Sequence, residues 1–173
     1  MFACIFQRGM RSAECGMTER EAALSTPHPA PRTSNSALID CAYAFSPRVE
    51  QTAPDTVVLD LDGLAHLFGS PANIAAGIAR QATERGLKVN VGVASNPDAA
   101  IHAARGFPGI TLIPPGQEAQ RLAGLPVELL EPAPEIQETL DIWGIRTFRD
   151  LAALPATGDS SSRVLSQTGG ESA

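Results

Sequence analysis

Three acidic residues surround one strand-like run of the sequence. Residues 56–61 form the run, with Asp55 directly before it, Asp60 near its end and Asp62 just after it. Carboxylates grouped in this way can hold Mg²⁺ for phosphoryl transfer, but Asp is equally common in turns and caps. Strand side chains alternate between faces, so Asp60 and Asp62 share a face and Asp55 points the other way. Spacing alone leaves both interpretations open.

Two other segments carry residues that can bind anions. In "GVASNPDAA", Asn96 begins a predicted helix whose N-terminus would attract an anion. The segment lacks the GxGxxG and GxxxxGK[ST] patterns, so an ordinary cap is favoured. In "WGIRTFRDL", Arg146 and Arg149 lie near a helix start, where a hairpin can offer backbone amides to a DNA phosphate. The alternative is a solvated hairpin packed on the sheet.

The elements that would position these residues alternate along the chain. Caps and glycines mark the helix ends: Ser70 with Pro71, Asn96 with Pro97, and Gly86 after the first of these helices. The resulting β-α-β-α-β-α order predicts an α/β or split βαβ sheet layered with helices. The predicted strands cover residues 2–6, 56–61, 87–95 and 110–114, and the predicted helices cover residues 70–86, 96–106 and part of 116–130.

The remaining segments differ in composition. Residues 131–155 predict two short helices around a turn at Gly144, with Ile136, Leu140 and Trp143 on one helix face. Residues 7–44 carry few order signals, apart from a short helix "GMTEREAAL" with a capping box at Thr18 and Glu21, followed by a proline-rich linker. Residues 156–173 have the composition of a disordered tail.

Bulk properties exclude several classes of protein. The 173 residues have a net charge of −6 and a pI near 5.0, so the chain has no long-range attraction to nucleic acid. Three cysteines without CxxC spacing indicate reduced cytosolic thiols and no zinc site. No apolar stretch approaches the length of a membrane span, so we expect no membrane partner.

Four segments together resemble the Y-family DNA polymerases (UmuC/DinB-like). These are "FSPRVEQTAPDTVVLDLDGLAHLFG", "VNVGVASNPDAAIHAARG", "PVELL" and "LDIWGIRTFRDLAALP", which occur here in the family's order. The similarity is greatest to the catalytically inactive ImuB-like branch. The resemblance implies a ferredoxin-like palm sheet with helices, followed by a small helix-hairpin-helix thumb. The implied parts are a palm at residues 1–6 and 45–130, a shortened fingers remnant or linker at 7–44, a thumb at 131–155 and a tail at 156–173.

The resemblance also implies that metal ligands of the family are replaced in this chain. Active members carry an Asp-Glu pair where this chain has Asp55 and Thr56, and a further Asp where Gln7 follows the first strand. Pro97 replaces the lysine of the family's SNK motif. One carboxylate cannot neutralise two metal ions, so Asp55 is expected to be a vestigial metal ligand. We therefore expect no cofactor, although active relatives use Mg²⁺, and we expect the chain not to be an enzyme.

The same comparison implies partners and a cellular role. In the thumb, Gly144, Arg146, Thr147 and Arg149 are the implied DNA-binding residues. DNA would be bound weakly, and a replicative or translesion polymerase and the sliding clamp would be partners, as in the family. The implied setting is cytoplasmic DNA repair, translesion synthesis and the SOS response. The family's little finger and its clamp-binding tail are not recognisable, so the chain resembles a truncated, internally deleted member.

Four functional hypotheses remain at this point. The first is an ImuB-like accessory protein without catalysis, which the intact cap and core pattern of residues 45–155 favours. The second is a degenerate remnant without function, which the acidic pI favours. An active DNA-directed DNA polymerase is the third, and an unrelated α/β binding domain is the fourth.

Overall fold

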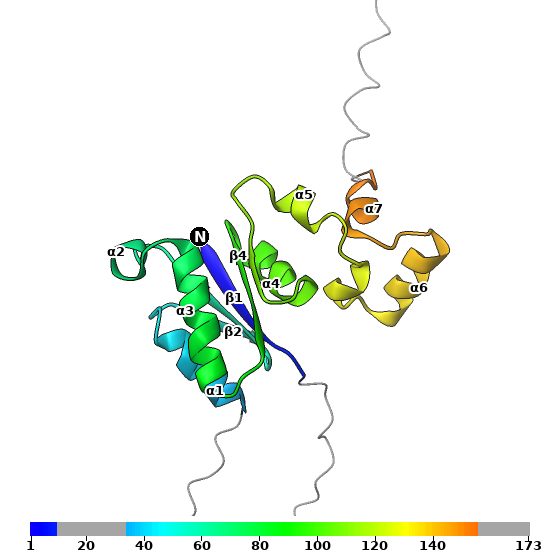
Figure 1. Ribbon diagram of the computed structural model, residues 1–173. Helices are drawn as coiled ribbons and strands as arrows, with labels where there is room; N and C mark the ends of the chain where they lie inside the picture. The colour runs from blue at the N-terminus through cyan, green and yellow to red at the C-terminus, as the bar shows by residue number, and fades with distance from the viewer. Residues whose placement is uncertain (10–33, 156–173) are drawn as a thin grey trace, which may run out of the picture. The chain divides into compact units, whose positions relative to one another are not determined.

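A five-stranded sheet forms the centre of the first of two structural units. The computed structural model describes residues 1–9 and 34–155, and the chain divides between Leu125 and Pro126 into a sheet unit and a hairpin unit. The strand order is β2-β3-β1-β4-β5, so the first strand of the chain lies in the middle of the sheet (Figure 1). Neighbouring strands are antiparallel except β4 and β5, which are parallel. The strands are β1 (Phe2–Gln7), β2 (Val49–Ala53), β3 (Thr56–Asp60), β4 (Val89–Ala94) and β5 (Ile110–Leu112).

The two helices with predicted caps begin as expected. The side chains of Ser70 and Asn96 accept hydrogen bonds from backbone N–H groups three residues later, at 3.3 and 2.8 Å. A proline follows each cap, where its missing N–H group has no partner to lose. The helices of the sheet unit are α1 (Ser34–Tyr43), α2 (Ala65–Phe68), α3 (Pro71–Glu84), α4 (Pro97–Gly106) and α5 (Glu118–Leu122).

One face of the sheet is covered by α1 and α3 (Figure 1). Alternate residues of the central strands point to this face, as the period of two in a strand requires. They meet apolar side chains from the two helices and form the main core of the sheet unit. The largest members of this core are Ile5, Leu38, Val57, Leu59, Ile74, Ile78, Val91 and Val93.

On the opposite face, α4 lies very close to β4. A Cβ atom at Gly92 would be 2.3 Å from the carbonyl oxygen of Ala100 and 2.6 Å from the nitrogen of Ala104, so only glycine fits there. The buried side of α4 consists of alanines, which allow the same close approach.

The buried side chain of Asn90 fixes the C-terminal end of α4. Its amide donates to the carbonyl oxygen of Ala104 at 3.0 Å, and its own oxygen accepts from the N–H group of Gly109 at 2.9 Å. Both ends of the amide are therefore satisfied, as a buried polar group requires. The arrangement holds the backbone of α4 at the residue before Arg105.

The hairpin unit is a small cluster of short helices. Its described elements are the 3₁₀ turn η1 (Val127–Leu130), α6 (Pro134–Ile142) and α7 (Phe148–Ala152). Gly144 has a φ of +72° and makes the turn between α6 and α7. The buried side chains are Val127, Leu140 and Ile145, with Phe148 and Leu151 partly buried against them.

The predicted mixed α/β fold is confirmed by the five-stranded sheet and its helices, with three elements missed. The sequence interpretation placed α1 in the segment 7–44 that it treated as a fingers remnant or linker, and it identified neither β2 nor the short helix α2. In the hairpin unit, Leu140 is buried as predicted, but Ile136 and Trp143 on the same face are 54% and 65% exposed. The predicted capping box at Thr18 and the predicted tail lie outside the described residues.

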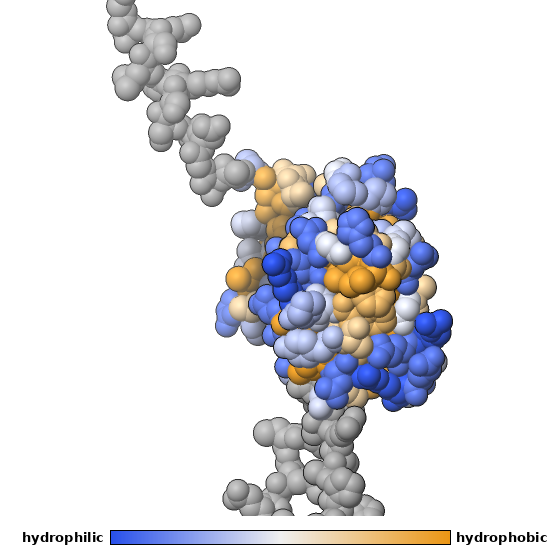
Figure 2. All heavy atoms as spheres, turned by 90° about the vertical axis from the view of Figure 1, so that its left-hand side faces the viewer, coloured by the Kyte–Doolittle hydropathy of each residue, from blue (hydrophilic) through white to orange (hydrophobic). Residues whose placement is uncertain are grey.

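The surface beside α2 is partly apolar. Leu67 and Phe68 of α2 are exposed, and the Phe68 ring lies 5.4 Å from the ring of Phe45. Figure 2 shows apolar side chains gathered on the side of the molecule that carries α2 and α3, within a mostly hydrophilic surface. None of the helices in residues 1–9 and 34–155 has the length and apolar character that crossing a membrane requires.

Candidate functional site

The candidate site singled out by the sequence lies where β1 ends and β3 begins. The N–H group of Gln7 donates to the backbone carbonyl of Asp55 at 2.8 Å, and Phe6 pairs with Thr56 in the strand register. Thr56 is fully buried, and its hydroxyl donates to a carboxylate oxygen of Asp55 at 2.8 Å. The carboxylate of Asp55 is therefore held by the residue next to it.

Arg105 reaches this site from α4. Its Nη2 atom donates to the hydroxyl oxygen of Thr56 at 3.3 Å, and its guanidinium carbon lies 5.8 Å from the centre of the Phe6 ring. That distance is within the range of a cation–π interaction. A guanidinium, a hydroxyl and a carboxylate thus follow one another in a hydrogen-bonded chain from Arg105 through Thr56 to Asp55.

The charges of Arg105 and Asp55 have opposite effects on the pKa of the Cys4 thiol. Burial raises the pKa of Cys4 to about 12, the positive charge of Arg105 works against this increase, and the negative charge of Asp55 adds to it. A thiol with this pKa stays protonated near neutral pH and is not a nucleophile.

The donor set at this site does not fit a pair of Mg²⁺ ions. Within the described part of the chain, no three His, Cys, Asp or Glu side chains are grouped so that they could share a metal ion. Thr56 supplies a neutral hydroxyl, and that hydroxyl is already hydrogen-bonded on both sides. Gln7 contributes an amide oxygen, Oε1, which is buried and has no hydrogen-bond partner among the described residues. Two hard cations need several anionic oxygens, and only Asp55 offers one here.

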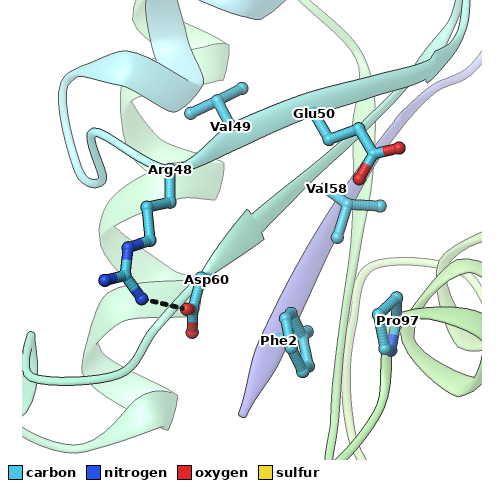
Figure 3. A pocket seen from close by; sticks show the side chains of 7 residues that line it. All are labelled: Phe2, Arg48, Val49, Glu50, Val58, Asp60 and Pro97. Atoms are coloured by element: carbon cyan, nitrogen blue, oxygen red, sulfur yellow. Dashed lines mark hydrogen bonds and ion pairs between the residues drawn. The ribbon is translucent and has the colours of Figure 1, made fainter.

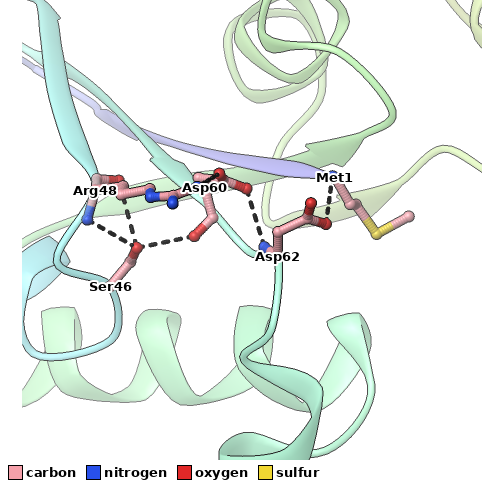
Figure 4. Close-up of polar contacts among 5 residues, drawn as sticks. All are labelled: Met1, Ser46, Arg48, Asp60 and Asp62. Atoms are coloured by element: carbon pink, nitrogen blue, oxygen red, sulfur yellow. Dashed lines mark hydrogen bonds and ion pairs between the residues drawn. The ribbon is translucent and has the colours of Figure 1, made fainter.

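Asp60 and Asp62 belong to a separate place in the sheet unit. The Asp62 N–H group donates to the Asp60 carboxylate at 2.9 Å, and the Ser46 hydroxyl donates to the Asp60 carbonyl at 2.8 Å (Figure 4). The amino group of Met1 lies 3.5 Å from the Asp62 carboxylate. The backbone hydrogen bond from Asp62, assisted by Arg48, lowers the pKa of Asp60. Asp60 therefore holds the turn after β3, which is the turn role that the sequence left open for it.

A pocket of about 320 Å³ lies beside this turn. Arg48 and Asp60 form an ion pair at its rim, 3.1 Å apart, and Glu50 adds a second negative charge (Figure 3). Phe2 and Pro97 line the opposite wall. Its size is at the small end of ligand sites, and its charged groups already pair with each other in part.

In the hairpin unit, the turn between α6 and α7 carries the predicted DNA-binding residues. The side chains of Arg146 and Arg149 are exposed. Thr147 caps α7, and its hydroxyl and N–H groups both donate to the carboxylate of Asp150, at 2.8 and 3.0 Å. These hydrogen bonds, the one with the Thr147 hydroxyl first, lower the pKa of Asp150.

The backbone amides of this turn are occupied within the chain. The N–H groups of Gly144 and Ile145 donate to carbonyl oxygens of α6 at 3.1 and 2.9 Å. The Arg146 N–H group donates to the Asp150 carboxylate at 3.3 Å. A phosphate could reach these amides only by displacing existing hydrogen bonds, so the side chains are the groups that remain available to a ligand.

Comparison with known proteins gives the family. Residues 6–105 match the sequence model of the impB/mucB/samB family, which is more than half of the chain. The chain belongs to this family. Members of the impB/mucB/samB family are related to the Y-family polymerases, so the resemblance noted in the sequence is confirmed.

Several curated relatives agree with this assignment. The protein ImuB of Caulobacter vibrioides (strain NA1000 / CB15N) is 29% identical over 126 residues, which are 73% of this chain and 28% of ImuB. DNA polymerase IV 2 of Mesorhizobium japonicum is 36% identical over 62% of this chain and 27% of the relative. DNA polymerase IV of Pelotomaculum thermopropionicum is 34% identical over 81% of this chain and 38% of the relative. The chain therefore spans less than two-fifths of the length of these relatives.

Solved structures of Y-family polymerases share the fold. A DinB family error-prone DNA polymerase from Sulfolobus solfataricus superposes with a TM-score of 0.59 at 17% identity, covering 90% of this chain and 60% of that polymerase. A post-insertion binary complex of Dbh DNA polymerase gives a TM-score of 0.53 at 20% identity, covering 72% and 38%.

One expectation from the sequence has to be corrected. The chain was expected not to be an enzyme because ligands appeared to be missing at Thr56 and Gln7. The relatives named DNA polymerase IV, at 34% and 36% identity, place it in a family of enzymes instead. A substitution in a motif changes which metal-binding atoms the site offers. It does not by itself place a chain outside a family of enzymes.

Sequence reasoning missed Arg105. The residue is 49 positions from Thr56 in the chain, and only the packing of α4 across the sheet brings them together. A usable signal was present, because Arg105 directly follows a run of small residues on a helix that must cover a strand. A long basic side chain at the end of such a helix reaches past the alanines to the end of the neighbouring strands.

Proposed function

We propose that this chain acts in translesion DNA synthesis, in the manner of ImuB, as an accessory protein that contacts DNA and works beside a replicative or translesion polymerase in the cytoplasm. Its membership of the impB/mucB/samB family is the observation that carries the proposal. The palm sheet and the similarity to ImuB support it. The sliding clamp and a place in the SOS response belong to the same proposal.

The DNA contact would depend on side chains of the hairpin unit. Arg146 and Arg149 are the only Lys or Arg residues between positions 126 and 155, against six Asp and Glu residues. Both arginines lie at the turn that Gly144 and Thr147 shape, and both are exposed. Because the backbone amides of the turn are occupied, neutralisation of DNA phosphates would fall to these two guanidinium groups.

Fluorescence anisotropy with labelled primer–template DNA tests this contact. The Arg146→Ala/Arg149→Ala variant should bind at least about tenfold more weakly at low salt, and the slope of log K against log salt should fall by about 2. A control variant, Arg80→Ala/Arg121→Ala, removes the same charge from exposed positions of the sheet unit. Equal affinities for the two variants would refute the hairpin as the contact, because net charge alone would then explain the loss.

Nucleotidyl transfer by the chain itself is the second candidate function. The DNA polymerase IV relatives and the Asp55 carboxylate at the start of β3 favour it. Primer extension with Mg²⁺ or Mn²⁺ decides between the two candidates. Extension that disappears in Asp55→Asn would support transfer by this chain. A change in extension by a separate Y-family polymerase when the chain is added would support the accessory role.

A further inference from the structure

A positive charge is built into the position that the family resemblance assigns to metal ions. The Asp55 carboxylate is hydrogen-bonded to the Thr56 hydroxyl, and Arg105 donates to that same hydroxyl. The guanidinium is therefore one hydroxyl group away from the carboxylate. Opposite charges at such a separation, at a partly buried site, attract each other more strongly than they would in water.

The surroundings keep the guanidinium at this place. The ring of Phe6 lies under Arg105, with 5.8 Å between the guanidinium carbon and the ring centre. The close contact of α4 with Gly92 and the bridge made by Asn90 fix the helix from which the side chain extends. With the helix fixed and the ring of Phe6 beside it, the guanidinium is favoured at the place where it donates to Thr56.

We infer that Arg105 serves as an internal counter-ion to Asp55 and excludes divalent cations from the site where β1 ends and β3 begins. A cation placed at Asp55 would meet the guanidinium's like charge at close range. The inference concerns this one cluster and does not depend on DNA contact or on the proposed accessory role.

Restoring the missing carboxylates tests the inference directly. The variant Gln7→Asp/Thr56→Glu places three carboxylates at the site while Arg105 remains, and a second variant adds Arg105→Ala. Mn²⁺ alone is the probe, and binding is measured from the loss of the free-ion EPR signal. We expect at least a tenfold tighter Mn²⁺ affinity when Arg105 is absent. Affinities within twofold of each other would overturn the inference.

The lysine replacement separates charge from shape. Arg105→Lys in the same three-carboxylate background keeps the positive charge but changes the geometry of the group. Its Mn²⁺ affinity should stay close to that of the variant with arginine. Affinity as tight as that of the alanine variant would mean that shape, and not charge, keeps cations out, and the inference would fail.

A second measurement uses the native site, where the fold is least disturbed. Asp55→Asn should lower the melting temperature of the native chain, since it removes the negative charge that the inference assigns to Arg105 as its counter-charge. In an Arg105→Ala background the same change should be neutral or stabilising, because it removes a carboxylate that has lost its counter-ion. Equal shifts in both backgrounds would show that the two charges are not coupled, and would refute the inference even if the redesigned variants did not fold.

Discussion

Replacing Gly92 with alanine should damage the sheet unit more than any other single added methyl group at its described glycines. The new Cβ atom would lie 2.3 Å from the carbonyl oxygen of Ala100 and 2.6 Å from the backbone nitrogen of Ala104. Both obstacles are backbone atoms, so no side chain can rotate to make room. Non-bonded atoms prefer separations of about 3.5–4.0 Å, so α4 has to move away from β4 by at least about 1 Å.

That shift sets the size of the effect. Overpacking a well-packed core typically costs about 1–3 kcal/mol, and a clash with two backbone atoms belongs at the upper end, about 3 kcal/mol. For a unit of this size such a loss lowers the melting temperature by about 10 °C. The movement would also draw Arg105 away from Thr56, so the packing defect should weaken the polar chain at the site.

Urea denaturation followed by far-UV circular dichroism measures the free energy of unfolding. Gly124→Ala is the matched control, because a Cβ atom there meets nothing within 4 Å and the backbone φ is not positive. The control should stay within about 0.5 kcal/mol of the native chain. If Gly92→Ala also stays within that range, α4 does not lie as close to β4 as described and the reasoning is refuted.

Three further predictions follow from single groups. Because the pKa of Asp60 is lowered, its stabilising effect is present above about pH 4 and is lost as the pH falls through the lowered pKa. In urea denaturation at a series of pH values, the free energy of unfolding of Asp60→Asn should therefore fall less steeply toward acid pH than that of the native chain. In a Cys15→Ser variant, the buried thiols of Cys4 and Cys41, whose pKa values are raised, should react with Ellman's reagent about 100-fold more slowly than after unfolding; rapid reaction would contradict their burial. Asn96→Ala should remove the cap of α4 and cost about 1 kcal/mol in thermal melts, with Asn96→Asp retaining most of the stability.

Local signals explain what the sequence could predict. Ser70 and Asn96 cap their helices through hydrogen bonds that span three residues, so short segments contain all the necessary information. Gly144 makes its turn with a positive φ, which favours glycine at that position. The apolar alternation of Val89, Val91 and Val93 in β4 likewise determines which of its side chains enter the core.

The missed elements are stabilised by distant partners. In α1, residues such as Leu38 become fully buried only because α3 and the sheet lie over them, and the helix begins in a segment with linker composition. In β2 the middle residues are exposed and no alternation is visible, so pairing with β3 supplies its order. Tertiary contacts outweigh weak local propensity in both elements.

The same limit applied at the candidate site. The sequence motif placed Asp55 and Thr56 at one site, because they are adjacent in the chain. It could not show that Arg105 crosses the sheet to reach them, since that contact depends on how closely α4 approaches Gly92. The expectation that the chain is not an enzyme was wrong, because a count of metal ligands in one motif was extended to a statement about the whole chain.

The central place of β1 has a consequence for biosynthesis. Phe2 pairs with Asp60 on one side and with Ala94 on the other, so both partner strands come much later in the chain. Ribosomes add about 5–20 residues per second, so the nascent apolar strand waits for several seconds before it can be paired on both edges. Pairing over such sequence separations also slows folding itself. A strand that is synthesised well before both of its partners is therefore exposed during that interval and is then a natural target for chaperones.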